Sequence, residues 1–291
     1  SYLNSSIKMN NAEAFLMAEV YQPHLYRDYI KLGKMDYLYD KVDLYDGLKA
    51  IMQGKASTAI IPEIQHQLQD IEHHMMHFLD NHDEQRIASP EFVGNANIAK
   101  PAMLVSALLS SSPTMLYFGQ EVGESGAENA GFGQPSRTSI FDYIGVPQHQ
   151  KWMNDGKFDG GQLNDDEKQL RAFYKKVMNF TLEHSSMTGA YVDLHQSNHL
   201  NDSCYAFIRH DQNELVIAAA NFHQLNSEFI DLVIPQNVLQ DIDLKEGTYG
   251  MKECIGNHST ATLKVNNHGE GFISLQLEPL ATSALVLTLP L

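Results

Sequence analysis

Short apolar runs alternate with helix-like segments up to about Met187. The runs occupy residues 15–21, 35–40, 75–81 and 114–118, and runs of this length suit strands buried on both faces. Between them, regular apolar faces predict helices over residues 46–53, 62–73, 96–110 and 164–184. For the last of these, Asn164 or Asp165 is the expected N-cap. Strand–helix alternation of this kind predicts a parallel sheet with helical crossovers.

The pattern changes after about Ser186. Seven short extended runs follow, separated by turn-rich pieces, at residues 192–195, 204–209, 215–220, 228–234, 261–265, 271–277 and 283–289. Runs at this spacing predict an antiparallel β-sandwich. We therefore expect two domains, one over residues 1–187 and one over residues 188–291.

The charge balance restricts the partners of the chain. The 291 residues include 36 acidic and 20 basic side chains, a formal net charge of −16. This argues against binding to nucleic acid, whose phosphates need a basic face. The balance suits a neutral polyol substrate, although simple solubility explains it equally well.

Other global features leave several questions open. The two cysteines, Cys204 and Cys254, do not imply a disulfide framework, and whether they pair is open. No apolar stretch approaches the ~18 residues that would span a membrane, so no membrane partner is expected. No signal peptide is recognised, but a leader preceding Ser1 would escape notice, so the compartment is unknown.

The segment from Phe78 to Arg86 places a histidine, a carboxylate and an arginine directly after a predicted buried strand. Polar residues at such a place are costly unless they are hydrogen-bonded or functional. In a parallel barrel, the carboxyl ends of the strands form the active-site face. The alternative is a solvated loop in which Asp83 and Arg86 form a local pair.

Glu19 also ends a predicted buried strand, in the segment Ala18-Glu19-Val20-Tyr21. Partial burial there would raise its pKa and suit a proton donor. The alternative is a carboxylate that only makes structural hydrogen bonds. Glu19 and Asp83 end strands that are separated by one intervening strand, so in a closed barrel they would converge on one mouth. Two converging carboxylates are what glycosidic bond cleavage needs.

Three motifs carry a resemblance to a known family. Phe78-Leu79-Asp80-Asn81-His82-Asp83, followed by Arg86, resembles the signature of the seventh barrel strand of the α-amylase family, glycoside hydrolase family 13. Ala18-Glu19-Val20-Tyr21 is similar to the signature of the fifth strand. Residues 113–123 resemble the eighth-strand segment Pro-x-x-x-Tyr-x-Gly-x-Glu-x-Gly, and residues 277–287 look like the last strands of the C-terminal sandwich. The motifs stand in family order and spacing and cover nearly the whole chain.

The resemblance implies a fold and a set of roles. The fold would be the C-terminal half of a (β/α)8 TIM barrel followed by an antiparallel β-sandwich. Glu19 would be the general acid/base and Asp83 the transition-state stabiliser of a retaining enzyme that acts on starch or maltooligosaccharides. His82, Tyr21 and Arg86 would bind the sugar. The family also places substrate contacts in the loop that corresponds to residues 137–143.

One catalytic group is missing. The family nucleophile is an Asp on the fourth strand, two residues after an Arg, and only 18 residues precede Glu19. Arg-x-Asp occurs only at Arg209-His210-Asp211, in the second zone, which we interpret as coincidence. The family's third-strand signature and its inserted domain, which often carries calcium, are absent too. We therefore expect a fragment with little activity alone, which needs the N-terminal half of the barrel or a second copy to cover its open edges.

Alternative functions remain open. A glucosyl-transferring enzyme of the same family, or a non-catalytic carbohydrate-binding or subunit homologue, would share these motifs. A carbohydrate-binding sandwich with a helical adaptor is disfavoured by the motifs of the first zone. The cluster His73, His74 and His77 is compatible with a metal, but acidic neighbours make a solvated helix end the better interpretation, so no metal site or cofactor is predicted in this chain.

Overall fold

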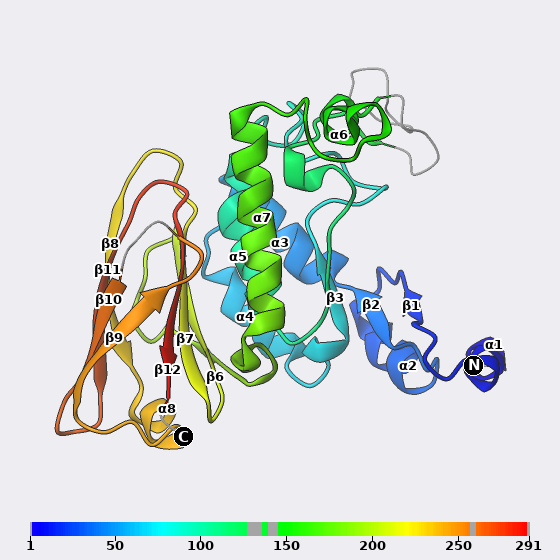
Figure 1. The fold of residues 1–291 in the computed structure, drawn as a ribbon. Coiled ribbons are helices and arrows are strands. Elements are labelled where there is room, and N and C mark those ends of the chain that lie inside the picture. The colour runs from blue at the N-terminus through cyan, green and yellow to red at the C-terminus, as the bar shows by residue number, and fades with distance from the viewer. Residues whose placement is uncertain (1, 127–135, 139–144, 257–259, 290–291) are drawn as a thin grey trace.

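The computed structural model describes residues 2–126, 136–138, 145–256 and 260–289. The first unit, up to about residue 187, contains a parallel four-stranded sheet in the order β1-β2-β3-β4 (Figure 1). Its strands are β1 (Met17–Ala18), β2 (Tyr37–Tyr39), β3 (Met75–Phe78) and β4 (Thr114–Met115). Each lies within one of the four predicted runs but is shorter than the run. The predicted strand order and parallel pairing are confirmed.

Helices surround this sheet. The α-helices are α1 (Tyr2–Asn10), α2 (Tyr26–Lys31), α3 (Asp46–Met52), α4 (Ile60–Leu68), α5 (Ala99–Leu108), α6 (Pro147–Met153) and α7 (Asp165–Glu183). A π-helix, η2, spans Lys41–Tyr45, and 3-10 turns occur at η1 (Pro23–Leu25), η3 (Glu72–His74), η4 (Ala96–Ile98), η5 (Gln120–Val122), η6 (Asn154–Gly156) and η7 (Ser185–Thr188). The four predicted helices are present, whereas α1, α2 and α6 were not expected. α7 begins with a capping box between Asn164 and Glu167. Among the described residues, no helix has both the length and the apolar character needed to cross a membrane.

The second unit is an antiparallel sheet of eight strands in the order β5-β6-β7-β12-β9-β10-β11-β8. The strands are β5 (Ala190–Asp193), β6 (Cys204–His210), β7 (Glu214–Asn221), β8 (Glu228–Ile234), β9 (Gly247–Glu253), β10 (Thr260–Val265), β11 (Gly271–Leu277) and β12 (Thr282–Thr288). β12 meets β9 through only two residue pairs, and Figure 1 shows the sheet curling there into two facing layers. The predicted antiparallel fold class is confirmed. The sequence missed β9, whose two glycines weaken its apolar pattern, and the short helix α8 (Gln236–Asp241).

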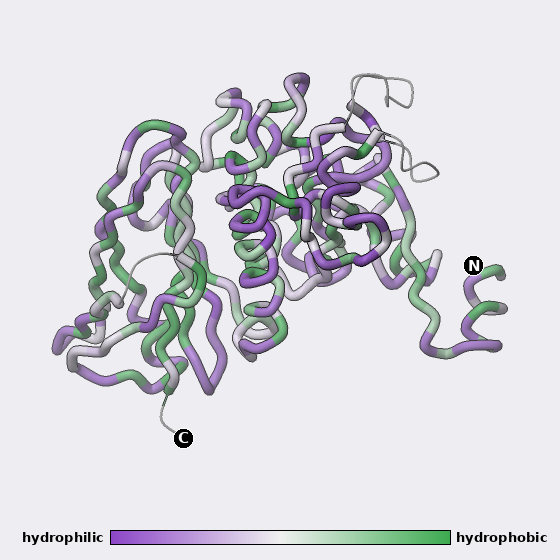
Figure 2. Tube along the Cα trace, turned by 45° about the horizontal axis from the view of Figure 1, so that its top comes forward, coloured by the Kyte–Doolittle hydropathy of each residue, from purple (hydrophilic) through white to green (hydrophobic). Residues whose placement is uncertain are grey.

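The two layers differ in how they are buried. Along β8 and β11 buried and exposed residues alternate, which Figure 2 shows as alternating green and purple along the outer strands. β6 and β7 are buried at every position instead. Alternate residues of β6 and β7, such as Ala206 and Ile208, belong to the core of the sandwich, whereas Phe207 and Ala218 belong to the core shared with α5 and α7. The inner layer therefore joins the two units through apolar packing.

Arg209 lies at this junction. It is 1 % exposed, and its guanidinium donates hydrogen bonds to four backbone carbonyls. Nη1 donates to the Leu109 carbonyl at 2.9 Å, just after α5, and Nη2 donates to the Met187 carbonyl at 2.6 Å, in η7. Further bonds reach the carbonyls of Ser186 at 3.3 Å and Gly189 at 3.1 Å. One side chain of β6 thus fixes the end of α5 and the turn that connects α7 to β5.

The predicted domain boundary near Met187 stays a prediction; the chain passes from α7 to β5 through η7. Both cysteines are free thiols. Cys204 is buried on β6, and Cys254 follows β9.

The carboxyl end of β2 is shaped by a buried carboxylate. Asp40 is 3 % exposed, and its Oδ1 accepts a hydrogen bond from the Leu44 N–H at 2.9 Å, which caps the π-helix. Its Oδ2 lies 3.9 Å from Nε2 of His77, a buried residue whose Nδ1 lies 2.7 Å from the Ser106 carbonyl. Burial raises the pKa of Asp40 to about 7 and lowers the pKa of His77. Both groups therefore favour their uncharged forms inside the protein.

We predict that Arg209→Met lowers the free energy of unfolding by about 2–4 kcal/mol, because buried carbonyl groups lose their donors. Urea denaturation measures the change. Arg27→Met is the matched control: Arg27 forms an exposed pair with Asp70, worth less than about 1 kcal/mol. Equal losses in the two variants would contradict the role given to Arg209.

We predict that Asp40→Asn flattens the dependence of stability on pH between about 4 and 8. An unfolded aspartate titrates near ~3.9, whereas the folded pKa is about 7, so the folded state holds the proton more tightly. The contribution of Asp40 is fully present below pH ~4 and is lost as the pH rises through about 7. As the pH rises over this range, the free energy of unfolding of the wild-type chain should fall by about 1 kcal/mol or more relative to that of the variant. Denaturation at several pH values measures the difference.

The control for this experiment is Asp155→Asn, which changes an exposed aspartate. It should keep the wild-type slope. A wild-type slope in Asp40→Asn as well would show that Asp40 is ionised in the folded protein throughout the range.

Candidate active site

The loop after β3 brings two of its polar residues, His82 and Asp83, to the surface. Asn81 is 1 % exposed, and its Oδ1 accepts hydrogen bonds from the N–H groups of Asp83 at 2.9 Å and Glu84 at 2.8 Å. This Asx-type turn ends the extended conformation that follows β3 and places His82 and Asp83 at the edge of the loop. The side chains of His82 and Asp83 are 38 % and 29 % exposed.

Glu19 follows β1 directly and reaches the same place. One ligand atom from each of Glu19, His82 and Asp83 lies within 4.8 Å of the others. His82 Nε2 is 3.5 Å from Asp83 Oδ2. The convergence of Glu19 and Asp83 expected from their strand positions is therefore present, although their catalytic roles stay predictions.

Tyr21 joins the group through its hydroxyl, which donates to Glu19 Oε1. The side chain is 44 % exposed. Burial, the bond to Glu19 and the surrounding carboxylates raise the pKa of Tyr21, so the phenol stays protonated and keeps donating. Glu19 itself is exposed, so the described residues do not supply the partial burial that we expected around a proton donor.

Arg86 does not join this group. The expectation that it contacts the substrate is not met in this structure, because its side chain is fully buried. Nε donates to Thr138 Oγ1 at 2.9 Å, and Nη1 lies 3.6 Å from Asp80 Oδ2. The guanidinium packs on the rings of Tyr117 and Phe118, at 4.3 and 4.9 Å from their centroids. The local pair of Asp83 and Arg86, which the sequence left open as an alternative, is absent from the described structure, where Arg86 pairs with the buried Asp80.

Arg137 takes the place beside Asp83 instead. Its Nη2 forms an ion pair with Asp83 Oδ1, and its Nε donates to the His82 carbonyl at 3.4 Å. Sequence reasoning marked the loop 137–143 as a place for substrate contacts but did not single out this arginine. Residues 139–144 lie outside the described residues.

A network of charges supports the site from the side of η2 and α3. The carboxylate of Glu84 accepts from Lys49 Nζ and the Tyr45 hydroxyl, both at 3.0 Å, and lies 3.2 Å from Lys41 Nζ. Burial acts to raise the pKa of Glu84, but the bond from Lys49 and the charges of Lys49 and Lys41 outweigh it and lower the pKa. The Lys41 ammonium lies 6.0 Å from the centre of the Tyr21 ring. Glu84 therefore stays ionised and holds these two lysines beside the site.

Glu19, His82 and Asp83 form the one group among the described residues whose ligand atoms lie close enough to hold a metal ion. Arg137 already pairs with Asp83, so a cation there would compete with a guanidinium. The histidines considered from the sequence do not form such a group: His77 is buried against Ser106, and His74 Nδ1 lies 2.8 Å from the Asp36 carbonyl. That no metal is needed stays a prediction.

The Arg-x-Asp match in the second unit has a structural explanation. Arg209 is buried at the junction described above. Asp211 lies in the turn between β6 and β7, where its Oδ1 accepts from the N–H groups of Asn213 at 2.8 Å and Glu214 at 3.0 Å. Asp211 shapes a hairpin and belongs to a different unit from Glu19 and Asp83.

Comparisons with known proteins bear on the fold that holds this site. Residues 195–288 match the family described as α-amylase, C-terminal all-β domain. No curated protein sequence matches the chain. A maltogenic α-amylase from Thermotoga neapolitana is similar in structure, with a TM-score of 0.68 and 15 % identity, over 99 % of this chain and 58 % of that one. An α-amylase from Geobacillus thermoleovorans in complex with acarbose gives 0.67 and 18 %, over 98 % and 56 %.

A cyclomaltodextrinase gives a TM-score of 0.68 and 16 % identity, over 98 % of this chain and 42 % of that one. The chain thus spans less than two thirds of the length of each of these structures, and its likeness to them is one of fold. Residues 195–288 match the α-amylase C-terminal all-β domain family, and over nearly its whole length the chain shares the fold of the corresponding part of these α-amylase and cyclomaltodextrinase structures.

Proposed function

We propose that this chain supplies two of the three catalytic carboxylates of a retaining glycoside hydrolase that cleaves α-glucosidic bonds in starch or maltooligosaccharides. The observation that carries the proposal is the convergence of Glu19 and Asp83, whose carboxylates follow different strands of a parallel sheet and lie within 4.8 Å of a common partner, His82. The fold adds support, because the solved structures that share it include α-amylases and a cyclomaltodextrinase.

In this proposal Glu19 protonates the glycosidic oxygen and later removes a proton from the attacking water. The Tyr21 hydroxyl, which donates to Glu19, orients that carboxylate. Asp83 and His82 hydrogen-bond the hydroxyls of the sugar at which cleavage occurs, and the negative charge of Asp83 stabilises the oxocarbenium-like transition state. Arg137 holds one oxygen of Asp83 and leaves the other to the sugar.

The nucleophile comes from outside these residues. Retaining hydrolysis needs a carboxylate about 5–5.5 Å from the acid. Arg-x-Asp occurs in this chain only at Arg209–Asp211, in the hairpin of the sandwich. We propose that the N-terminal half of a (β/α)8 barrel, or a second copy of the chain, completes the sheet beside β1 and β4 and that any calcium site lies there.

Two other functions remain. A glucosyl-transferring enzyme would use the same carboxylates and would differ in how water reaches the intermediate. A non-catalytic homologue that binds carbohydrate would not need Glu19, His82 and Asp83 to lie together, and their proximity favours an enzyme.

We predict that Glu19→Gln, made in the natural gene product that contains this chain, lowers turnover of maltooligosaccharides by about 100- to 10,000-fold and leaves their binding in place. In kcat/KM, which reports the steps up to the glycosyl-enzyme intermediate, the loss should be much smaller with an aryl α-maltoside whose leaving group needs no protonation. Asp83→Asn should lose at least about 100-fold on both substrates, because both need the stabilised transition state. Glu13→Gln, the same change at an exposed glutamate, is the control. Equal losses of kcat/KM in Glu19→Gln on both substrates would exclude Glu19 as the acid.

We also predict that the 291-residue chain alone shows no measurable turnover, whereas the natural gene product is active on the same maltooligosaccharides. The physical reason is the missing nucleophile. Reducing-end release, measured side by side, gives the comparison. A comparable rate from the chain alone would remove the argument for a nucleophile outside it.

A further inference from the structure

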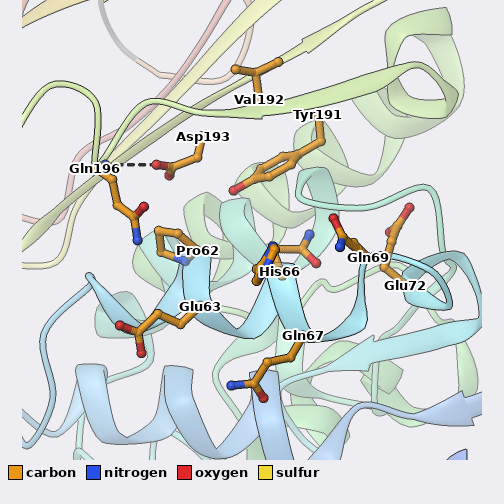
Figure 3. A pocket seen from close by; sticks show the side chains of 11 residues that line it. Pro62, Glu63, His66, Gln67, Gln69, Glu72, Tyr191, Val192, Asp193 and Gln196 are labelled. Atoms are coloured by element: carbon orange, nitrogen blue, oxygen red, sulfur yellow. Dashed lines mark hydrogen bonds between the residues drawn. The ribbon is translucent and has the colours of Figure 1, made fainter.

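A pocket of about 880 Å³ lies between the two units, where α4 and η3 face β5 and the turn that follows it (Figure 3). Its volume falls within the ~300–1,000 Å³ typical of ligand pockets. Residues from both units line it: His66, Gln67 and Gln69 from α4 and the residue after it, and Tyr191, Asp193 and Gln196 from β5 and its turn.

This pocket is separate from the carboxylate site. Glu72, which lines it, precedes β3, whereas His82 and Asp83 follow β3. Because the strands of the sheet are parallel, the two places lie at opposite ends of the strands. A molecule in the pocket would therefore leave Glu19 and Asp83 accessible, and the cleavage chemistry gives the pocket no role.

The lining indicates the kind of ligand. Gln67, Gln69 and Gln196 are exposed amides, and each can donate to one hydroxyl and accept from another. None of the described residues that line the pocket is Lys or Arg, and the lining includes Glu63, Glu72 and Asp193, so anions are disfavoured. Those three carboxylates do not gather around one point as metal ligands would: the group found among the described residues lies elsewhere. A neutral, hydroxyl-rich molecule matches this lining.

Tyr191 provides a fixed ring in the same pocket. Its hydroxyl lies 2.7 Å from the hydroxyl of Tyr205, which is fully buried on β6, so the ring is anchored at its tip as well as its backbone. Figure 3 shows the ring projecting from β5 toward α4, where Pro62 and His66 lie. An aromatic face held in place offers apolar surface to the C–H face of a pyranose ring at little entropic cost.

From this geometry we infer that the pocket between α4 and β5 is a second oligosaccharide-binding site, which holds a glucan chain on the protein at a distance from the site of cleavage. The choice of an α-glucan as the sugar rests on the proposed function; the pocket itself requires only a neutral oligosaccharide. Its two walls come from the two units, so binding there also depends on their fixed junction at Arg209.

The test uses the natural gene product carrying Glu19→Gln, so that maltoheptaose is not consumed, and isothermal titration calorimetry. The expected result is two sites per chain. His66→Ala combined with Gln69→Ala, two exposed positions whose change leaves the core untouched, should weaken one site at least tenfold and leave the other unchanged. Gln240→Ala, an exposed glutamine on α8, is the matched control and should change neither site. Tyr191→Phe, which keeps the ring, should retain most of the binding.

A single site per chain, or two sites that the double variant leaves unchanged, overturns the inference. With Glu19 intact, the double variant should cleave maltotriose at the wild-type rate, because that short substrate needs only the carboxylate site. If the double variant loses one of the two sites but the natural gene product shows no hydrolytic activity, this inference stands and the proposed function is rejected. If the natural gene product is fully active but binds maltoheptaose at one site only, this inference is rejected and the proposed function stands.

Discussion

The geometry of the candidate active site depends on one buried guanidinium. Arg86 is fully buried, and its contacts come from three segments that lie far apart in the sequence: Asp80 at the end of β3, Tyr117 and Phe118 after β4, and Thr138. Thr138 follows Arg137, the residue that pairs with Asp83. A shift of this guanidinium would therefore displace both Arg137 and Asp83, although Arg86 itself does not reach the surface.

Burying such a group has a cost. Burial raises the pKa of Asp80 to about 7, and the charge of Arg86 only partly opposes this. A buried ion pair of this kind is weak evidence for stability, because desolvation cancels much of the attraction. We infer that its value lies in fixing where the loops after β3 and β4 run. Arg209 has the corresponding place between the two units, where it satisfies carbonyls at the end of α5 and in η7.

The sequence predicted the features that depend on local pattern. Buried runs located all four parallel strands, and the motifs that end two of them placed Glu19 and Asp83 at one mouth. The orientation of Arg86 could not be predicted, because the same residue after a strand fits a solvent-facing loop and a buried pair equally well. Arg137 lies 54 positions from Asp83, and only the tertiary fold brings them together. β9 escaped notice because its single fully buried residue, Met251, gives no periodic pattern.

The account rests on Glu19 and Asp83 acting on the same glycosidic bond. The most direct measurement is a crystal structure of the natural gene product carrying Glu19→Gln with a maltooligosaccharide bound. The account predicts that the side chain at position 19 lies within hydrogen-bonding distance of a glycosidic oxygen, and that the Asp83 carboxylate accepts hydrogen bonds from hydroxyls of the adjoining ring. A sugar chain bound across this face with neither contact would contradict it.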